Sequence, residues 1–437
     1  MMQSASIRRG IGSQVLAAAL WAACAALYAG EEAAWEKVPA QDLPLPRIDQ
    51  ILSPGLFDGE LRRTVLCPPD GKPVDFGLPH DGTGADKRPY PALMGAYKRA
   101  GAQGFLWLDL NADGKQDAAE ALPVKDGQEL GPFRWEAHYD DGTSGPYLFK
   151  LKHSGEAGHF TVLRAQGKQA RFKQHAVVLL DENGNGRYDD LGQDAVLVQG
   201  QPVTFLSRQL YLGDDLFELL VHPAGQTLEL RPLPKTEMGE VNLFHMYRPA
   251  QKSEALRFHT LIVQGRDGAF SFDDQIKSRM LPAGAYDLVF GLLERGTERV
   301  ILKRGERTSF TVEPAKIATP AWGGPVAGKL NLESDGKVVK VHKPLFMGQG
   351  SEIYLPTDWE KIPLRAALYY IWYDQVYRAE RSDVSGNKPY ELKPNGDLAP
   401  VEFAIVSSNE YKVVVEYKSG ILGTVKAEER VNLVAKR

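Results

Sequence analysis

Two stretches of the chain place oxygen-bearing side chains at alternate positions in front of a glycine. The first begins with Asp109, continues with Asn111 and Asp113, and reaches Gly114 directly afterwards. Carboxylate and amide oxygens at alternate positions of a tight loop can face one centre, which suits a hard cation such as Ca²⁺. The glycine permits the sharp turn that this arrangement needs. The chemistry expected here is coordination of calcium for structure rather than catalysis.

The first stretch reproduces the twelve-residue spacing of an EF-hand calcium loop. In that resemblance Lys115 offers its backbone carbonyl, and Glu120 closes the shell with both carboxylate oxygens. Asp-x-Asp-x-Asp-Gly loops of this kind also resemble those of dockerins and other extracellular bacterial proteins, although the duplicated helical pattern of a dockerin is absent. Magnesium fits less well because it keeps several waters and strict octahedral geometry. The expected ligands are Asp109, Asn111, Asp113, Lys115, Asp117 and Glu120.

A second loop begins 72 residues later, at Asp181. Its position twelve is Gly192, so the closing carboxylate must come from Asp190 or Asp194, and alignment of the two copies favours Asp194. Two asparagines lower the charge of this loop, which predicts weaker binding than at the first; both affinities are expected on the order of 10⁻⁴–10⁻³ M. The expected ligands are Asp181, Asn183, Asn185, Arg187 through its backbone carbonyl, Asp189 and Asp194.

Ordinary hairpin turns use the same residue types, because Asp and Asn bond the local backbone and tolerate positive φ. Both loops therefore have a plain turn as their alternative. The flanks of the first loop favour strands over the helices of an EF-hand: Phe105–Leu108 is short and apolar, and Pro123 would stop an outgoing helix within about one turn.

The loops belong to an internal repeat. Phe105–Leu108 recurs as Val177–Leu180, and Glu120–Val124 recurs as Asp194–Val198. Loop, acid, apolar strand and turn return in the same order, which predicts two similar β units within residues 96–235.

Composition limits the class of protein. The 437 residues hold 52 Lys and Arg against 56 Asp and Glu, a net charge of −4 that does not favour nucleic-acid binding. Forty-three glycines and 28 prolines indicate many turns between short strands. The sequence has no Gly-x-Ser-x-Gly elbow, Walker loop or His-Glu-x-x-His motif.

The N-terminus predicts export. Arg8 and Arg9 precede fifteen apolar residues at 15–29, which as a helix would rise about 22 Å, less than the bilayer core of about 30 Å. A signal peptide at 1–29 and a secreted or periplasmic chain without a transmembrane span are expected. Alternatively, Trp21-Ala-Ala-Cys24 resembles a bacterial lipoprotein box, which would place a lipid anchor on Cys24.

The remaining chain reads as several antiparallel β-sandwich or β-hairpin domains in series, with little helix. An N-terminal arm and small β region at 30–95 precedes the repeats, with a short helix expected at 92–100. Within 236–314, Leu281–Leu288 resembles a strand of carboxypeptidase-regulatory-like and bacterial immunoglobulin-like modules, which implies an immunoglobulin-like or transthyretin-like domain. A C-terminal β-sandwich is expected at 315–437.

These patterns predict a secreted, non-enzymatic, modular β protein with structural calcium, whose partners are cell-surface polymers or proteins. One alternative is a secreted hydrolase acting on an extracellular polymer, which would need two carboxylates about 5–10 Å apart in a cleft. Another is a lipid-anchored envelope protein.

Overall fold

The computed structural model describes residues 34–44, 63–80, 90–100, 103–117, 120–154, 158–235, 237–243, 246, 257–357, 364–373, 380–393, 398–405 and 409–433. The expected signal peptide and Cys24 lie outside these residues. Within them the chain forms strands arranged in many, mostly antiparallel sheets and no α-helix, which confirms the predicted mostly β fold. In this described part, no helix has the length and apolar character needed to cross a membrane.

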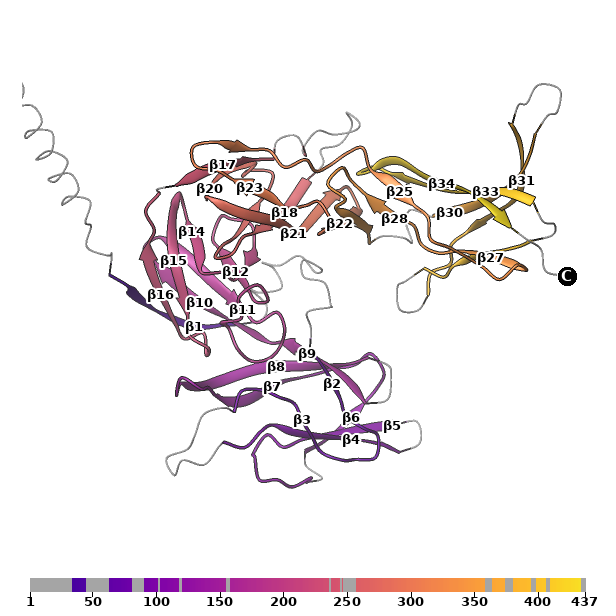
Figure 1. Ribbon diagram of the computed structural model, residues 1–437. Coiled ribbons are helices and arrows are strands. Elements are labelled where there is room, and N and C mark those ends of the chain that lie inside the picture. The colour runs from indigo at the N-terminus through magenta and orange to yellow at the C-terminus, as the bar shows by residue number, and fades with distance from the viewer. Residues whose placement is uncertain are drawn as a thin grey trace, which may run out of the picture.

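The first repeat unit consists of two four-stranded antiparallel sheets, at the bottom of Figure 1. One sheet has the order β3-β4-β5-β6 and the other the order β2-β9-β8-β7. The strands are β2 (Thr64–Leu66), β3 (Val74–Asp75), β4 (Met94–Ala100), β5 (Gln103–Leu108), β6 (Ala121–Val124), β7 (Glu129–His138), β8 (Ser144–His153) and β9 (His159–Arg164).

The short helix expected at 92–100 is wrong, because this segment forms strand β4. It pairs with β5 from Gly95 opposite Leu108 to Ala100 opposite Gln103. Gly95 lies against the Phe76 ring, and a Cβ there would come within 2.2 Å of the ring. Pairing and packing thus override the weak helical preference of the segment.

The second repeat unit is an eight-stranded sheet with the order β13-β12-β11-β10-β1-β16-β15-β14. Strand β1 joins its two halves: residues 40–44 pair with β10, and residues 36–39 pair with β16. The strands are β1 (Glu36–Pro44), β10 (Gln166–Phe172), β11 (His175–Leu180), β12 (Ala195–Val198), β13 (Thr204–Phe205), β14 (Gln209–Leu212), β15 (Asp215–Val221) and β16 (Thr227–Pro232).

The strand order of the first unit recurs in the second. β10-β11-β12 repeats β4-β5-β6, and β16-β15-β14 repeats β9-β8-β7. In the first unit, β2 pairs with β9 and β3 pairs with β4. In the second unit, the single strand β1 makes both equivalent pairings, with β16 and with β10. The whole first unit therefore lies, along the chain, between the first and second strands of the second unit. One hydrophobic cluster contains buried residues of both units, among them Phe76, Leu106, Tyr147, Val177 and Leu228.

Two further sheets are formed by the strands between residues 238 and 356 other than β26 and β27. A three-stranded sheet has the order β20-β17-β24, and a larger sheet has the order β19-β18-β21-β22-β29-β28-β25 with β23 paired to β21. The larger sheet joins strands from both sides of residue 314. The strands are β17 (Met238–Asn242), β18 (Arg257–Gln264), β19 (Ala269–Phe272), β20 (Ser278–Pro282), β21 (Gly284–Arg295), β22 (Glu298–Lys303), β23 (Phe310–Val312), β24 (Ile317–Ala318), β25 (Ala327–Lys329), β28 (Leu345–Met347) and β29 (Ile353–Pro356).

The C-terminal part contains a three-stranded sheet, β26-β27-β32, and a four-stranded sheet, β31-β30-β33-β34, at the right of Figure 1. Residues of both sheets, such as Val339, Phe403 and Val413, belong to one buried cluster. The strands are β26 (Leu332–Ser334), β27 (Val338–Val341), β30 (Arg365–Tyr373), β31 (Glu380–Pro389), β32 (Val401–Ala404), β33 (Asn409–Ser419) and β34 (Gly423–Leu433).

Candidate cation-binding loops

The first loop, residues 109–120, connects β5 to β6, so its flanks are strands. The last strand pair before it joins Trp107 to Ala121. Leu106 and Leu108 are buried on one face of β5, which fixes the position at which the chain leaves the sheet at Asp109. The loop itself is largely exposed from residue 110 to residue 117.

A ladder of side-chain to backbone hydrogen bonds organises the first loop. Asp109 accepts from the backbone N–H of Asp113 at 3.0 Å and, through its other oxygen, from that of Gly114 at 2.9 Å. Asn111 Oδ1 accepts from the same Asp113 N–H at 3.0 Å, and Asp113 accepts from the N–H of Lys115 at 2.8 Å. The positive φ angles of Ala112 and Gly114, 58° and 74°, bend the backbone around these oxygens.

This ladder gathers the first two expected ligands. One oxygen each of Asp109 and Asn111 lies 3.0 Å from the same nitrogen, so the two oxygens are no more than twice that distance apart. Each carboxylate or amide oxygen has two lone pairs, and one backbone hydrogen bond uses only one of them. The loop thus brings together two oxygens that keep lone pairs not used by these hydrogen bonds.

The other expected ligands of the first loop are placed as follows. Lys115 Nζ lies 3.8 Å from an oxygen of Asp113, and the carbonyl of Asp117 accepts from the N–H of Glu120 at 3.0 Å. Oε2 of Glu120 is buried and has no hydrogen-bond partner among the described residues. A buried carboxylate oxygen without a donor is costly, and a cation is one way to satisfy it.

The second loop, residues 181–194, connects β11 to β12 and repeats the same ladder. Asp181 accepts from the N–H groups of Gly184 and Gly186 at 2.7 and 2.8 Å. Asn183 Oδ1 accepts from the N–H of Asn185 at 3.0 Å, and Asn185 Oδ1 accepts from the N–H of Arg187 at 2.8 Å. The local fold of the two loops is therefore alike.

Protein donors occupy the carboxylates of the second loop. The side-chain amides of Asn183 and Asn185 both donate to one oxygen of Asp190, at 2.9 and 2.6 Å. The carboxylate of Asp189 faces the Arg187 guanidinium, with 3.0 Å between Oδ1 and Nε. Sequence reasoning preferred Asp189 and Asp194 and left Asp190 as an alternative, whereas the structure places Asp190 against the two asparagines.

Asp181 and Asp194 are neighbours because the last strand pair before the second loop joins Leu180 to Ala195. Both carboxylates are almost fully buried. Burial raises the pKa of Asp181 to about 6. Burial, together with the charge of Asp181, raises the pKa of Asp194 well above its usual value. Two neighbouring buried carboxyls resist ionising together.

The second loop also connects the two repeat units. The hydroxyl of Tyr147, on β8 of the first unit, donates to Asp181 at 2.7 Å, and that of Tyr139 donates to the carbonyl of Gly186 at 2.8 Å. The N–H of Arg63 donates to the carbonyl of Asn183 at 2.9 Å. Sequence reasoning missed Tyr147, since it stands 34 residues before Asp181 and in the other unit.

Glycine is required where the second loop meets the first unit. Gly186 has a φ of 85°, and a Cβ there would come within 2.6 Å of Pro79. At the equivalent Gly114 of the first loop, a Cβ would meet nothing within 4 Å. The same motif is therefore packed in one unit and open in the other.

Among the described residues, no group of three or more His, Cys, Asp or Glu side chains is arranged to hold a metal ion. Calcium also binds amide oxygens, and Asn111 supplies one in the ladder of the first loop. Comparison with protein families, with curated proteins and with solved structures found no match for the chain.

Proposed function

We propose that the protein is an exported, non-enzymatic, modular β protein that binds one structural calcium ion at the first loop. The observation that carries the proposal is the ladder of Asp109, Asn111 and Asp113 on a solvent-exposed loop, together with a carboxylate oxygen of Glu120 that has no partner among the residues that the structure describes. An ion there would offset the charge of the clustered carboxylates and would hold a long connection between two short strands.

The second loop mainly holds the two repeat units together. Its asparagine amides and Arg187 already face the nearby carboxylates Asp190 and Asp189, so an ion would have to displace these donors. Calcium at this loop stays a prediction of the sequence. Cell-surface polymers or proteins remain the proposed partners of the modular chain.

Calorimetric titration and thermal melting of the full mature chain test the calcium site. For a Kd on the order of 10⁻³ M, 10 mM calcium should stabilise the folded state by about 1.4 kcal/mol relative to chelator. Asp109→Ala should abolish both the heat of binding and the shift in melting temperature. Asp335→Ala is a matched control, because Asp335 also caps a turn by accepting from backbone N–H groups but lacks alternating ligands. Absence of heat and of a melting shift in the wild-type chain at millimolar calcium would refute the site.

Export is tested separately by the intact mass of the mature N-terminus. Cleavage after Ala29 gives an unmodified chain that starts at Gly30, whereas lipidation gives a chain that starts at an acylated Cys24. A chain that retains residues 1–29 would contradict both forms of export.

A further inference from the structure

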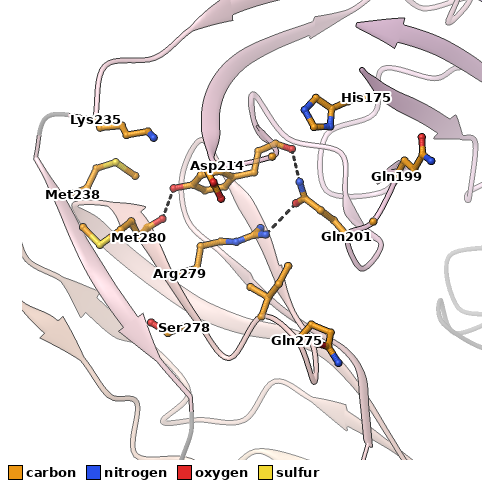
Figure 2. Close-up of a pocket in the computed structure, with 14 residues that line it drawn as sticks. His175, Gln199, Gln201, Asp214, Lys235, Met238, Gln275, Ser278, Arg279 and Met280 are labelled. Carbon is orange, nitrogen blue, oxygen red and sulfur yellow. Dashed lines mark hydrogen bonds between the residues drawn. The ribbon is translucent and has the colours of Figure 1, made fainter. Parts of the chain in front are cut away.

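A pocket of about 630 Å³ lies where the second repeat unit meets the β17–β20 sheet (Figure 2), and none of its described lining residues belongs to either acidic loop. Its volume falls in the range of small-molecule sites, about 300–1,000 Å³. One wall comes from the ends of β11, β12 and β14, and the opposite wall comes from β17, β20 and the segment before β20.

Hydrogen bonds join the second repeat unit to the part of the chain that follows it. The hydroxyl of Thr260 donates to the carbonyl of Val203 at 3.1 Å, and that of Ser271 donates to the carbonyl of Pro202 at 2.9 Å. A buried apolar cluster, which includes Phe205 and Ile262, also crosses this junction. The pocket is thus formed before any ligand arrives, and a preformed site loses less entropy on binding.

Arg279 is the central charged group of the pocket. Its guanidinium carbon lies 4.7 Å from the centre of the Tyr211 ring, and its Nη2 donates to Gln201 at 3.0 Å. Gln201 in turn donates to the carbonyl of Tyr211 at 3.2 Å, so the guanidinium is held on two sides, as Figure 2 shows. The hydroxyl of Tyr211 donates to the carbonyl of Met280 and anchors the ring.

The hydrogen-bonding capacity of Arg279 is only partly used. Within the described residues, Gln201 is its one side-chain acceptor, and Asp214 and Asp273 act on it from beyond ion-pair distance. Burial lowers the pKa of the guanidinium, and the charges of Tyr211, Asp273 and Asp214 offset this only in part. A guanidinium has five N–H donors in a planar fork that matches a carboxylate.

The other charges around the pocket suit a ligand with one negative charge. Lys235 is paired with Asp215 at 3.1 Å, and Asp214 is negative, so the positive charge available to a ligand is mainly that of Arg279. The exposed side chains of Gln199 and Gln275 offer amide donors and acceptors that suit hydroxyl groups. Asp214 is the single carboxylate among the lining residues that the structure describes, so these residues do not supply the carboxylate pair of a glycoside hydrolase.

We propose that this pocket binds a carboxylate-bearing sugar, a uronic acid unit, with the Arg279 guanidinium on the carboxylate and the amides of Gln199 and Gln275 on ring hydroxyls. The site is independent of calcium at the first loop. It gives the chain a direct means of binding an acidic extracellular polysaccharide, which goes beyond a structural role for its metal.

The test is a titration of the full mature chain with trigalacturonate, followed by NMR or calorimetry. Chelator is present throughout because calcium itself associates with uronates. The wild-type chain should bind trigalacturonate and should not bind its neutral methyl ester. Equal binding of the ester would overturn the proposal, and so would equal binding of a sulfated galactose trimer, because that result would remove the preference for a carboxylate. Absence of binding to trigalacturonate would also overturn it.

Variants locate the site. Arg279→Gln should weaken binding about tenfold or more, since it removes a charge-assisted hydrogen bond. Asp214→Asn should tighten binding about twofold, because it removes an exposed repulsive charge. Arg266→Gln is the matched control at an exposed turn outside the pocket, and it should bind as the wild type does.

Since Arg279 also packs on Tyr211, its variant is checked by thermal melting before titration. If Arg279→Gln does not fold, Asp214→Asn decides the question, and unchanged or weaker binding in that variant would contradict the proposal. Asp109→Ala should bind trigalacturonate normally, so a failure of the calcium site and a failure of this pocket are told apart.

Discussion

The two acidic loops share a sequence motif and a backbone, yet they stand in opposite surroundings. In the first, Asp109 and Asn111 hold their oxygens over an exposed loop, and its glycine, Gly114, has open space around it. In the second, Asp181 is buried and bonded to Tyr147 of the other unit, and Gly186 is packed against Pro79. The comparison teaches that the same turn can have two different uses. Its side-chain oxygens organise the backbone in both loops, and the surroundings decide whether these oxygens remain available to a ligand.

The largest expected difference between the loops concerns their glycines. Gly186→Ala should destabilise the folded chain by about 3 kcal/mol or more, because it combines a left-handed residue with overlap against Pro79. Gly114→Ala should cost about 1 kcal/mol, since only the backbone penalty applies. Urea unfolding in chelator measures both values. Equal losses of unfolding free energy in the two variants would show that the packing difference between the loops does not affect stability.

The tyrosine contact gives the next effect. Tyr147→Phe should cost about 1–3 kcal/mol, because a buried carboxylate loses one of its donors. Tyr139→Phe, which removes a hydrogen bond to the neutral carbonyl of Gly186, should cost about 1 kcal/mol. The same unfolding measurement ranks the two variants. A larger loss of stability in Tyr139→Phe than in Tyr147→Phe would mean that the bond to Asp181 is not the main hydrogen bond between the two repeat units.

Hydrogen exchange should reveal the smallest difference. Calcium at 10 mM should slow exchange of the Asp113 and Gly114 amides about tenfold, in line with a stabilisation of about 1.4 kcal/mol. The amides of Gly184 and Gly186 should be protected equally with calcium and with chelator, because their acceptor, Asp181, is held by the first unit. A calcium response in the second loop, and none in the first, would reverse the assignment.

Much of the fold was predictable from local patterns. The apolar runs Phe105–Leu108 and Val177–Leu180 predict a strand before each loop, and the structure has both. The segment at 94–100 misled because its residue types suit a helix as well as a strand, and only pairing with β5 decides between them. Long-range pairing of this kind leaves no periodic trace in the segment itself.

The candidate sites likewise differ in how far local sequence patterns predict them. The oxygens of Asp109 and Asn111 are set by neighbours two to five residues away, so their sequence spacing is informative. The burial of Asp181 depends on Tyr147, and the pocket around Arg279 draws on several separate segments; neither has a local motif. Contacts between distant segments are fixed by the folded topology, which spacing within one segment does not encode.

Strand β1 has a consequence for the order of assembly. During synthesis, residues 36–44 emerge first but must wait until β10 and β16, more than 120 residues later, are available to pair. The intervening unit can close around β2 and β3 in the meantime, and its completion shortens the distance that β1 has to bridge. A chain that lacks the residues up to Pro44 would lose β1, so β10 and β16 would become exposed edges of two separate half-sheets. Such edges are prone to self-association, although the first repeat unit would keep all its strands.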